Sequence, residues 1–193
     1  MTGSAHGPWR DVLLFGGMVA SDGYTTAVGA TTRLALQIDC QSWAPAGEPD
    51  RGAPAVEIES DGKRIGYELV GEVLATRSQW ADGWALSAYG IAFYVLETHA
   101  RGEPPAAGSL VRVRGQLCVA EDYVTELFEP REQLRDCAVR TWKVQRIVRL
   151  GHSGDRRVPM IDRRDAGQRG FLLDLRGSPA PAGGDQPISG PRR

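Results

Sequence analysis

The side chains that most often carry catalysis or bind metal ions are few in this sequence and widely spaced. The 193 residues include three histidines and three cysteines, namely His6, His99, His152, Cys40, Cys118 and Cys137. No two of them have the spacing of a zinc or redox motif, and three cysteines are too few for a disulfide framework. Residues 151–155 contain the types of a serine-hydrolase triad, but consecutive loop residues cannot adopt triad geometry. The sequence therefore predicts no catalytic residue, metal site or cofactor, and it favours a binding protein over an enzyme.

Tyrosines and basic residues suggest a nucleic-acid-binding site more strongly than the histidines and cysteines suggest a catalytic or metal site. Proteins bind nucleic acid with aromatic rings that stack on bases and with Arg or Lys side chains that neutralise phosphates. The predicted nucleic-acid-binding residues are Tyr89, Tyr94, Tyr123, Arg112, Arg114, Lys143 and Arg149. For Arg112 and Arg114, an ordinary solvated strand face is the competing interpretation.

The charges are divided unevenly along the chain. The net charge is −1 and the isoelectric point is about 6.3, which argues against strong non-specific DNA binding. Residues 39–126 carry 14 acidic and 7 basic side chains, whereas residues 131–176 carry 12 basic and 6 acidic ones. A basic C-terminal part on an acidic body suits a nucleic-acid strand along one side, or an acidic protein partner.

Strands must position these residues, and two Asp-Gly pairs indicate how. Asp61-Gly62 and Asp82-Gly83 separate three apolar runs, and Asp-Gly tolerates the positive φ angles of a type I′ hairpin turn. We therefore expect three consecutive antiparallel strands. A period of two in hydrophobicity marks further strands at 34–40, 111–119 and 138–150.

The remaining features agree with an all-β chain. Gly71 lies in mid-strand, where a glycine indicates a bend or a close backbone approach. Only residues 130–136, which begin with Pro130, suggest a short helical turn. The predicted fold is a small antiparallel barrel with additional N-terminal strands.

Part of the chain resembles a known family. It has a long strand, Tyr67–Arg77, around Gly71, then Phe93-Tyr94-Val95-Leu96, and then the pattern G-x-x-V-x-V-x-G-x-L from Gly108 to Leu117. These segments are similar to the first, third and fourth strands of an OB-fold barrel of the single-stranded DNA-binding type. The resemblance covers residues 65–150 and implies that Trp142–Leu150 closes the barrel as the fifth strand.

The sequence departs from the family pattern at two places. Residues 101–108 contain Pro104-Pro105 where the family has a helix. The second and third strands share residues 84–98, so we expect a break with a bulge at Gly90, which leaves Tyr89 and Tyr94 pointing outward. Without a bulge, both faces of residues 91–96 are apolar, and another element must cover one of them.

Four segments follow from these patterns. Residues 1–54 hold N-terminal strands and a loop that join or wrap the barrel, residues 55–150 form the barrel, and residues 151–177 are an arginine-rich extension. Residues 178–193 are rich in Pro and Gly, which predicts a disordered tail.

Two other functions stay open at this point. A protein-interaction or assembly module would bury the apolar 91–96 surface and the 171–175 segment against another protein or a second copy. An enzyme with a cofactor pocket that has no linear motif is the third possibility.

Cysteine usage and apolar runs predict a cytoplasmic protein with no membrane contact. The cysteines suit a reducing compartment, and no apolar stretch approaches the roughly 18 residues of a membrane-spanning helix. A secretion signal is the competing interpretation, because Val12–Ala20 is an apolar run that follows Arg10.

Overall fold

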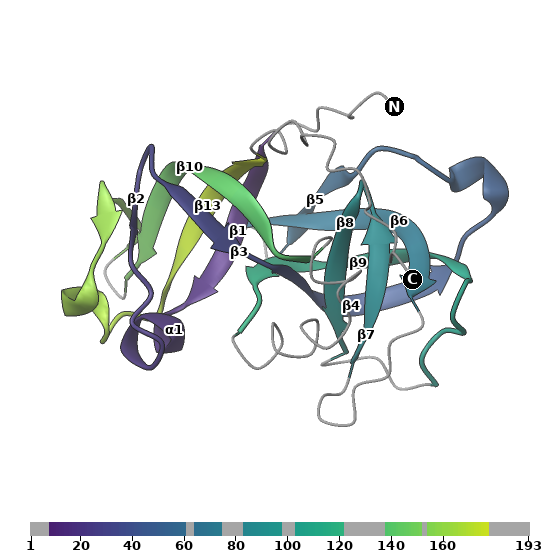
Figure 1. The fold of residues 1–193 in the computed structure, drawn as a ribbon, viewed down its shortest axis with the longest axis horizontal. Coiled ribbons are helices and arrows are strands. Elements are labelled where there is room, and N and C mark those ends of the chain that lie inside the picture. The colour runs from purple at the N-terminus through teal and green to yellow at the C-terminus, as the bar shows by residue number, and fades with distance from the viewer. Residues whose placement is uncertain are drawn as a thin grey trace, which may run out of the picture.

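The computed structural model describes residues 8–60, 64–74, 83–97, 103–121, 138–151 and 154–177. Strands dominate these residues, and they form two lobes side by side (Figure 1). The predicted tail 178–193, the predicted turn at 130–136, Tyr123, and Asp61, Gly62 and Asp82 of the two predicted turns lie outside the described residues.

The first lobe is a closed five-stranded barrel, compatible with an OB-like barrel. Its elements are β4 (Leu36–Pro45), the 3-10 helix η1 (Glu48–Asp50), β5 (Val56–Ser60), β6 (Arg64–Leu74), β7 (Gly83–Ala88), β8 (Ile91–Leu96) and β9 (Leu110–Val119). Around the ring the order is β6, β7, β8, β4, β9 and back to β6, and within this ring only the β4–β8 pair is parallel. Strand β5 pairs with β6 outside the ring. The expected meander is therefore present from β5 to β8.

The strand that closes the barrel differs from the expectation. Strand β4 lies between β8 and β9, whereas residues 140–150 pair in the second lobe. The closing strand thus precedes the other barrel strands in the chain. Both segments alternate apolar and polar residues, and this local pattern does not specify which strand pairs with β9.

The second lobe is an open sheet that combines both ends of the described chain. Its elements are β1 (Trp9–Phe15), α1 (Gly16–Ala20), β2 (Thr26–Ala27), β3 (Thr31–Leu34), β10 (Arg140–Leu150), β11 (Arg156–Arg157), β12 (Met160–Ile161), the 3-10 helix η2 (Arg163–Asp165) and β13 (Gly170–Gly177). Strand β13 lies between β10 and β1, while β3 and β11 pair with the other edge of β10. Strands β2 and β12 form a separate two-stranded ribbon.

One hydrophobic core runs through both lobes. It includes Trp9, Phe93, Trp142 and Phe171, all of them buried. The apolar run considered as a secretion signal forms the end of β1 and all of α1, and most of its side chains are buried. Strand β1 also pairs with β9 of the barrel, in parallel.

Two glycines explain local features of the barrel. A methyl group on Gly71 would lie 2.5 Å from the carbonyl oxygen of Ser87, so β6 and β7 approach closely there, as expected. At Gly90 the structure has a turn instead of the expected bulge. Tyr89 and Gly90 have φ angles of 56° and 70° and join β7 to β8, as the central residues of a type I′ hairpin do.

Candidate functional site

Tyr94 does not point outward as the sequence analysis expected. It lies on β8 and is only 3% exposed, in a cluster of small apolar side chains that includes Ala35, Ala85 and Ala120. The expectation was wrong because both faces of β8 are covered: Phe93 and Val95 face the main core, and Tyr94 faces this second cluster. A buried ring cannot stack on a base.

Tyr89 is half-buried at the hairpin tip. Its ring packs against Trp9 with centroids 6.0 Å apart, and its hydroxyl accepts a hydrogen bond of 3.4 Å from the backbone N–H of Val70. Burial raises the pKa of this hydroxyl. The positive φ angle is uncommon for an aromatic residue, and these contacts hold it in place.

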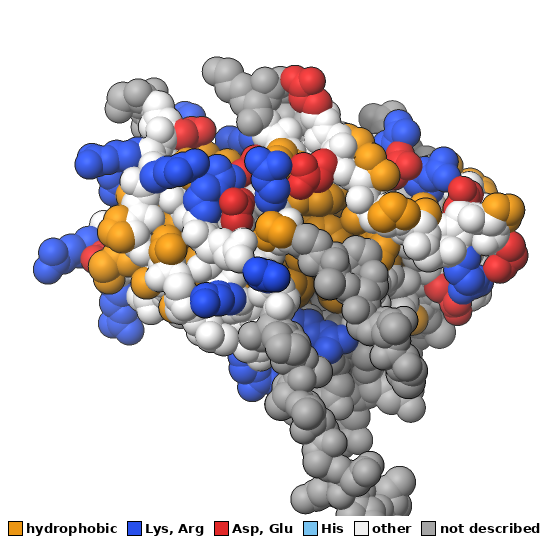
Figure 2. Space-filling view, turned by 90° about the horizontal axis from the view of Figure 1, so that it is seen from above, with side chains coloured by type: hydrophobic (Ala, Val, Ile, Leu, Met, Phe, Trp, Pro, Cys, Tyr) orange, Lys and Arg blue, Asp and Glu red, His pale blue; other side chains and the backbone are white. Residues whose placement is uncertain are grey.

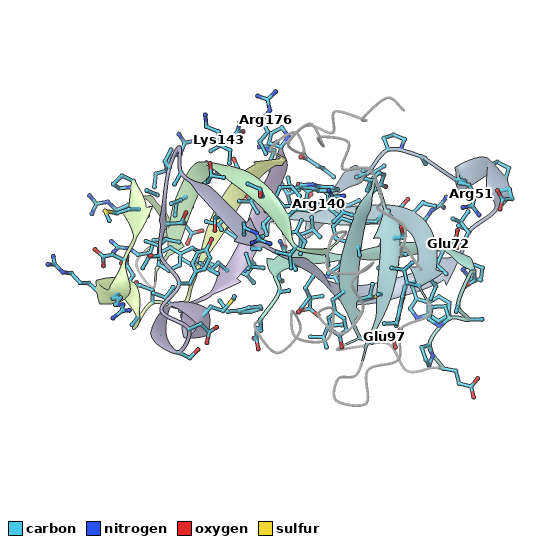
Figure 3. All side chains as sticks on the ribbon, in the orientation of Figure 1. Arg51, Glu72, Glu97, Arg140, Lys143 and Arg176 are labelled. Carbon is cyan, nitrogen blue, oxygen red and sulfur yellow. The ribbon has the colours of Figure 1, made fainter. Side chains whose placement is uncertain are left out.

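Arg112 and Arg114 are on the outer face of β9, and carboxylates already neutralise them. Both pair with Glu68 of the neighbouring strand β6, and Arg112 also lies 3.0 Å from Asp50. At the same end of the barrel, Arg51 pairs with Glu48 and Glu72, as Figure 3 shows for Glu72. Arg51, Arg112 and Arg114 of the barrel are therefore parts of an alternating network of charges.

Arg149 and Lys143 come from the same strand but have different surroundings. Arg149 pairs with Asp165 of η2 at 3.3 Å. Lys143 is exposed. The structure therefore does not bring the predicted site residues together: they are divided between the barrel and the second lobe, and Tyr123 is outside the described residues.

The apolar segments considered for protein assembly are occupied within the chain. Residues 91–95 are all buried in the barrel wall, and residues 171–175 form the central strand of the second lobe, with all but Asp174 buried. Neither segment is an exposed apolar surface.

A different group of basic residues comes together on the outside of the second lobe. Lys143 of β10 is directly opposite Arg176 of β13, and Arg33 of β3 is directly opposite Thr141, two residues from Lys143. Directly paired residues lie on the same side of a sheet. We call Arg33, Lys143 and Arg176 the basic face; all three are exposed, and Lys143 and Arg176 point the same way in Figure 3.

Within the described part of the chain, no carboxylate forms an ion pair with any residue of the basic face. Like charges directly opposite each other destabilise a sheet. The Lys143–Arg176 pair therefore costs folding free energy that an anion bound between the two side chains would offset.

The wider charge distribution follows the same division. The described residues of the second lobe, 8–34 and 138–177, carry twelve basic and six acidic side chains. The described barrel residues, 36–121, carry four basic and ten acidic ones. Figure 2 shows basic side chains spread over the left half of the molecule, the half that contains the second lobe. A polyanion is therefore attracted to one lobe and repelled by the other.

A cluster of charged side chains next to the basic face connects the strands β1, β10 and β13 by hydrogen bonds. Arg146 donates to Asp174 at 2.8 Å and 2.9 Å and also to Asp11, whose backbone N–H bonds Asp174 at 3.1 Å. β-Bulges interrupt β1 between Trp9 and Val12 and β10 just before Arg146. The sequence analysis missed this cluster because its members come from three strands that are far apart in the chain.

The buried thiols are not poised for nucleophilic chemistry. Burial raises the pKa of Cys40 to about 12, and it also raises the pKa of Cys118. Both are therefore thiols at neutral pH, and the thiolate is the nucleophilic form. Among the residues that the structure describes, no three His, Cys, Asp or Glu side chains gather as a metal site. No helix in that part of the chain is long and apolar enough to cross a bilayer.

No family model, no curated protein and no solved structure matches the chain.

Proposed function

We propose that this protein binds single-stranded or structured nucleic acid, and that the phosphates contact the basic face rather than the barrel. The observation that carries the proposal is the Lys143–Arg176 pair, two cations in direct cross-strand register with Arg33 beside them. The barrel arginines support this choice by contrast, since Arg112 and Arg114 already have carboxylate partners.

The chemistry of the basic face suits phosphates better than bases. Its two arginines and its lysine, with the neighbouring hydroxyl of Thr141, are all donors to phosphate oxygens, and contacts to phosphates carry no sequence information. The aromatic residue between β3 and β13, Trp142, is buried and points into the core. We therefore expect binding that depends strongly on salt and weakly on sequence.

The test is a fluorescence-anisotropy titration of a mixed-sequence single-stranded oligonucleotide at several salt concentrations. The variant Lys143→Gln/Arg176→Gln removes two charges and keeps most of each side chain's length. We expect about tenfold weaker binding at low salt. Because two phosphate contacts are lost, the slope of log affinity against log salt should become shallower by about 1.4.

The matched control is Arg112→Gln/Arg114→Gln, which removes the same charge from the barrel. We expect this variant to retain most of its affinity and the wild-type salt slope. If the wild-type chain binds no oligonucleotide at low salt, the proposed function is wrong. If only the barrel variant loses binding, the site is the barrel face, and equal losses in both variants mean that neither face is a defined site.

A further inference from the structure

Arg10 lies at the boundary between the two lobes, on the strand that follows the basic face. The strands β3, β10, β13 and β1 are consecutive neighbours, and the first three carry Arg33, Lys143 and Arg176. In β1, Trp9 pairs with Leu175, and both side chains are buried in the core. Arg10 lies in the bulge between Trp9 and Val12, whose side chains are both buried in the core, and it is exposed, as Arg176 is.

A carboxylate from the barrel holds Arg10. Its guanidinium is 3.3 Å from Glu57 of β5, the edge strand of the barrel. The two side chains are 50% and 43% exposed. Ion pairs this open to water contribute little to stability, so a phosphate can replace the carboxylate at low cost.

The backbone of Arg10 is fixed independently of this ion pair. The hydroxyl of Tyr67 accepts a hydrogen bond of 2.6 Å from the N–H of Arg10 and donates one of 3.1 Å to its carbonyl oxygen. Burial raises the pKa of Tyr67, so the hydroxyl keeps the proton that it donates. Only the side chain of Arg10 has to move when Glu57 releases it.

From these contacts we infer that Arg10 is a fourth phosphate-binding residue and that Glu57 restrains it in the free protein. The inference rests on the proposed function of the basic face. With neighbouring strands 4.7–4.9 Å apart, the four cations span about 14 Å across the sheet. Nucleic acid then crosses the strands from β3 to β1, and the acidic edge strand β5 marks the end of its path.

The test compares two single variants of β5 that have the same change in charge. Glu57→Gln removes the partner of Arg10. Glu59→Gln, two residues along the strand, removes an exposed carboxylate that forms no ion pair with a described residue. We expect Glu57→Gln to bind the same oligonucleotide about threefold more tightly at low salt with an unchanged salt slope, because Arg10 contacts a phosphate in both proteins and only the restraint by Glu57 is lost. Glu59→Gln should bind less tightly than Glu57→Gln, because it releases no cation.

A double variant and a repeat measurement complete the test. Arg10→Gln/Glu57→Gln should have a salt slope shallower than wild type by about 0.7, the value for one lost phosphate contact. If this double variant keeps the wild-type slope, or if Glu57→Gln and Glu59→Gln bind equally tightly, the inference is wrong. Lys143→Gln/Arg176→Gln is measured in the same series: a loss of affinity there means that the proposed function holds although the inference has failed. Binding equal to wild type in that double variant would instead refute the basic face itself.

Discussion

Asp11 has an uncommon backbone conformation that its hydrogen bonds explain. Its φ angle is 52°, in the left-handed region that non-glycine residues rarely adopt. The carboxylate accepts from Arg146 and, at 3.4 Å, from the N–H of Ile65, while the carbonyl accepts from Gln116 at 2.8 Å. Ile65 and Gln116 belong to the barrel, so Asp11 connects the lobes through both its side chain and its backbone. Such strain persists only where the surroundings fix it.

Replacement of Arg146 by leucine should destabilise the protein strongly. Arg146 is largely buried, and its removal leaves the carboxylates of Asp11 and Asp174 close together without a cation. We expect the free energy of unfolding to fall by about 2–3 kcal/mol. This loss is smaller than for a fully buried charge that loses its partner, because the Arg146 side chain is about a quarter exposed. Urea denaturation measures this value without adding salt.

Lys143→Leu is the matched control, since it removes one positive charge from the same strand at an exposed position. We expect its free energy of unfolding to stay within about 0.5 kcal/mol of wild type or to rise, because the repulsion with Arg176 is relieved. Equal destabilisation by both variants would contradict the distinction between the paired cluster and the unpaired basic face.

At the residue level, the sequence could indicate which basic side chains are exposed but not which side chains surround them. Lys143 was predicted as a phosphate-binding residue and is exposed, but Arg33 and Arg176 were not singled out. Their partnership depends on the pairing of β3, β10 and β13, which no local pattern specifies. For the same reason Glu68, the partner of Arg112 and Arg114, was missed.

Among the elements, the local rules of strand and turn formation predicted the meander correctly. Alternation and turn residues depend on neighbours in sequence, so they could identify β6, β7 and β9. The order of closure depends on long-range pairing instead. As a result β4, which closes the barrel, was assigned only to an N-terminal region that joins or wraps the barrel, and β10 was assigned to the barrel as its closing strand.

The close approach of β6 and β7 gives a prediction at this scale. Gly71→Ala should destabilise the barrel by about 2 kcal/mol, because the methyl group would lie 2.5 Å from the Ser87 carbonyl oxygen and 2.9 Å from Cγ of Leu86. Thermal or urea unfolding measures the loss. Gly17→Ala in α1 is the control, since nothing lies within 4 Å of its new methyl group, and it should not destabilise the protein. A neutral Gly71→Ala would mean that the two strands can separate without cost.

On the scale of the whole molecule, packing and charge divide the chain differently. The charges distinguish an acidic barrel from a basic second lobe. The core does not, because the same hydrophobic cluster contains Leu69 and Phe93 of the barrel and Trp142 and Phe171 of the second lobe. Arg140 adds a further link, since it donates to the carbonyl of Gly90 at the tip of the β7–β8 hairpin. The basic face is thus carried by a lobe that is not structurally independent.

Because the core is shared, we expect the two lobes to unfold in one transition. Hydrogen exchange followed by mass spectrometry across a urea series should show peptides from β6 and β9 losing protection together with peptides from β10 and β13. The variant Phe171→Ala sharpens the test, since it removes a fully buried ring from the second lobe and should lower the free energy of unfolding by about 3 kcal/mol. If the protein is a single cooperative unit, the free energy of exchange of the barrel peptides falls by the same amount. If the barrel peptides keep wild-type protection in Phe171→Ala while β10 and β13 exchange earlier, the two lobes are independent folding units. The second lobe alone would then be a practical fragment in which to study the basic face.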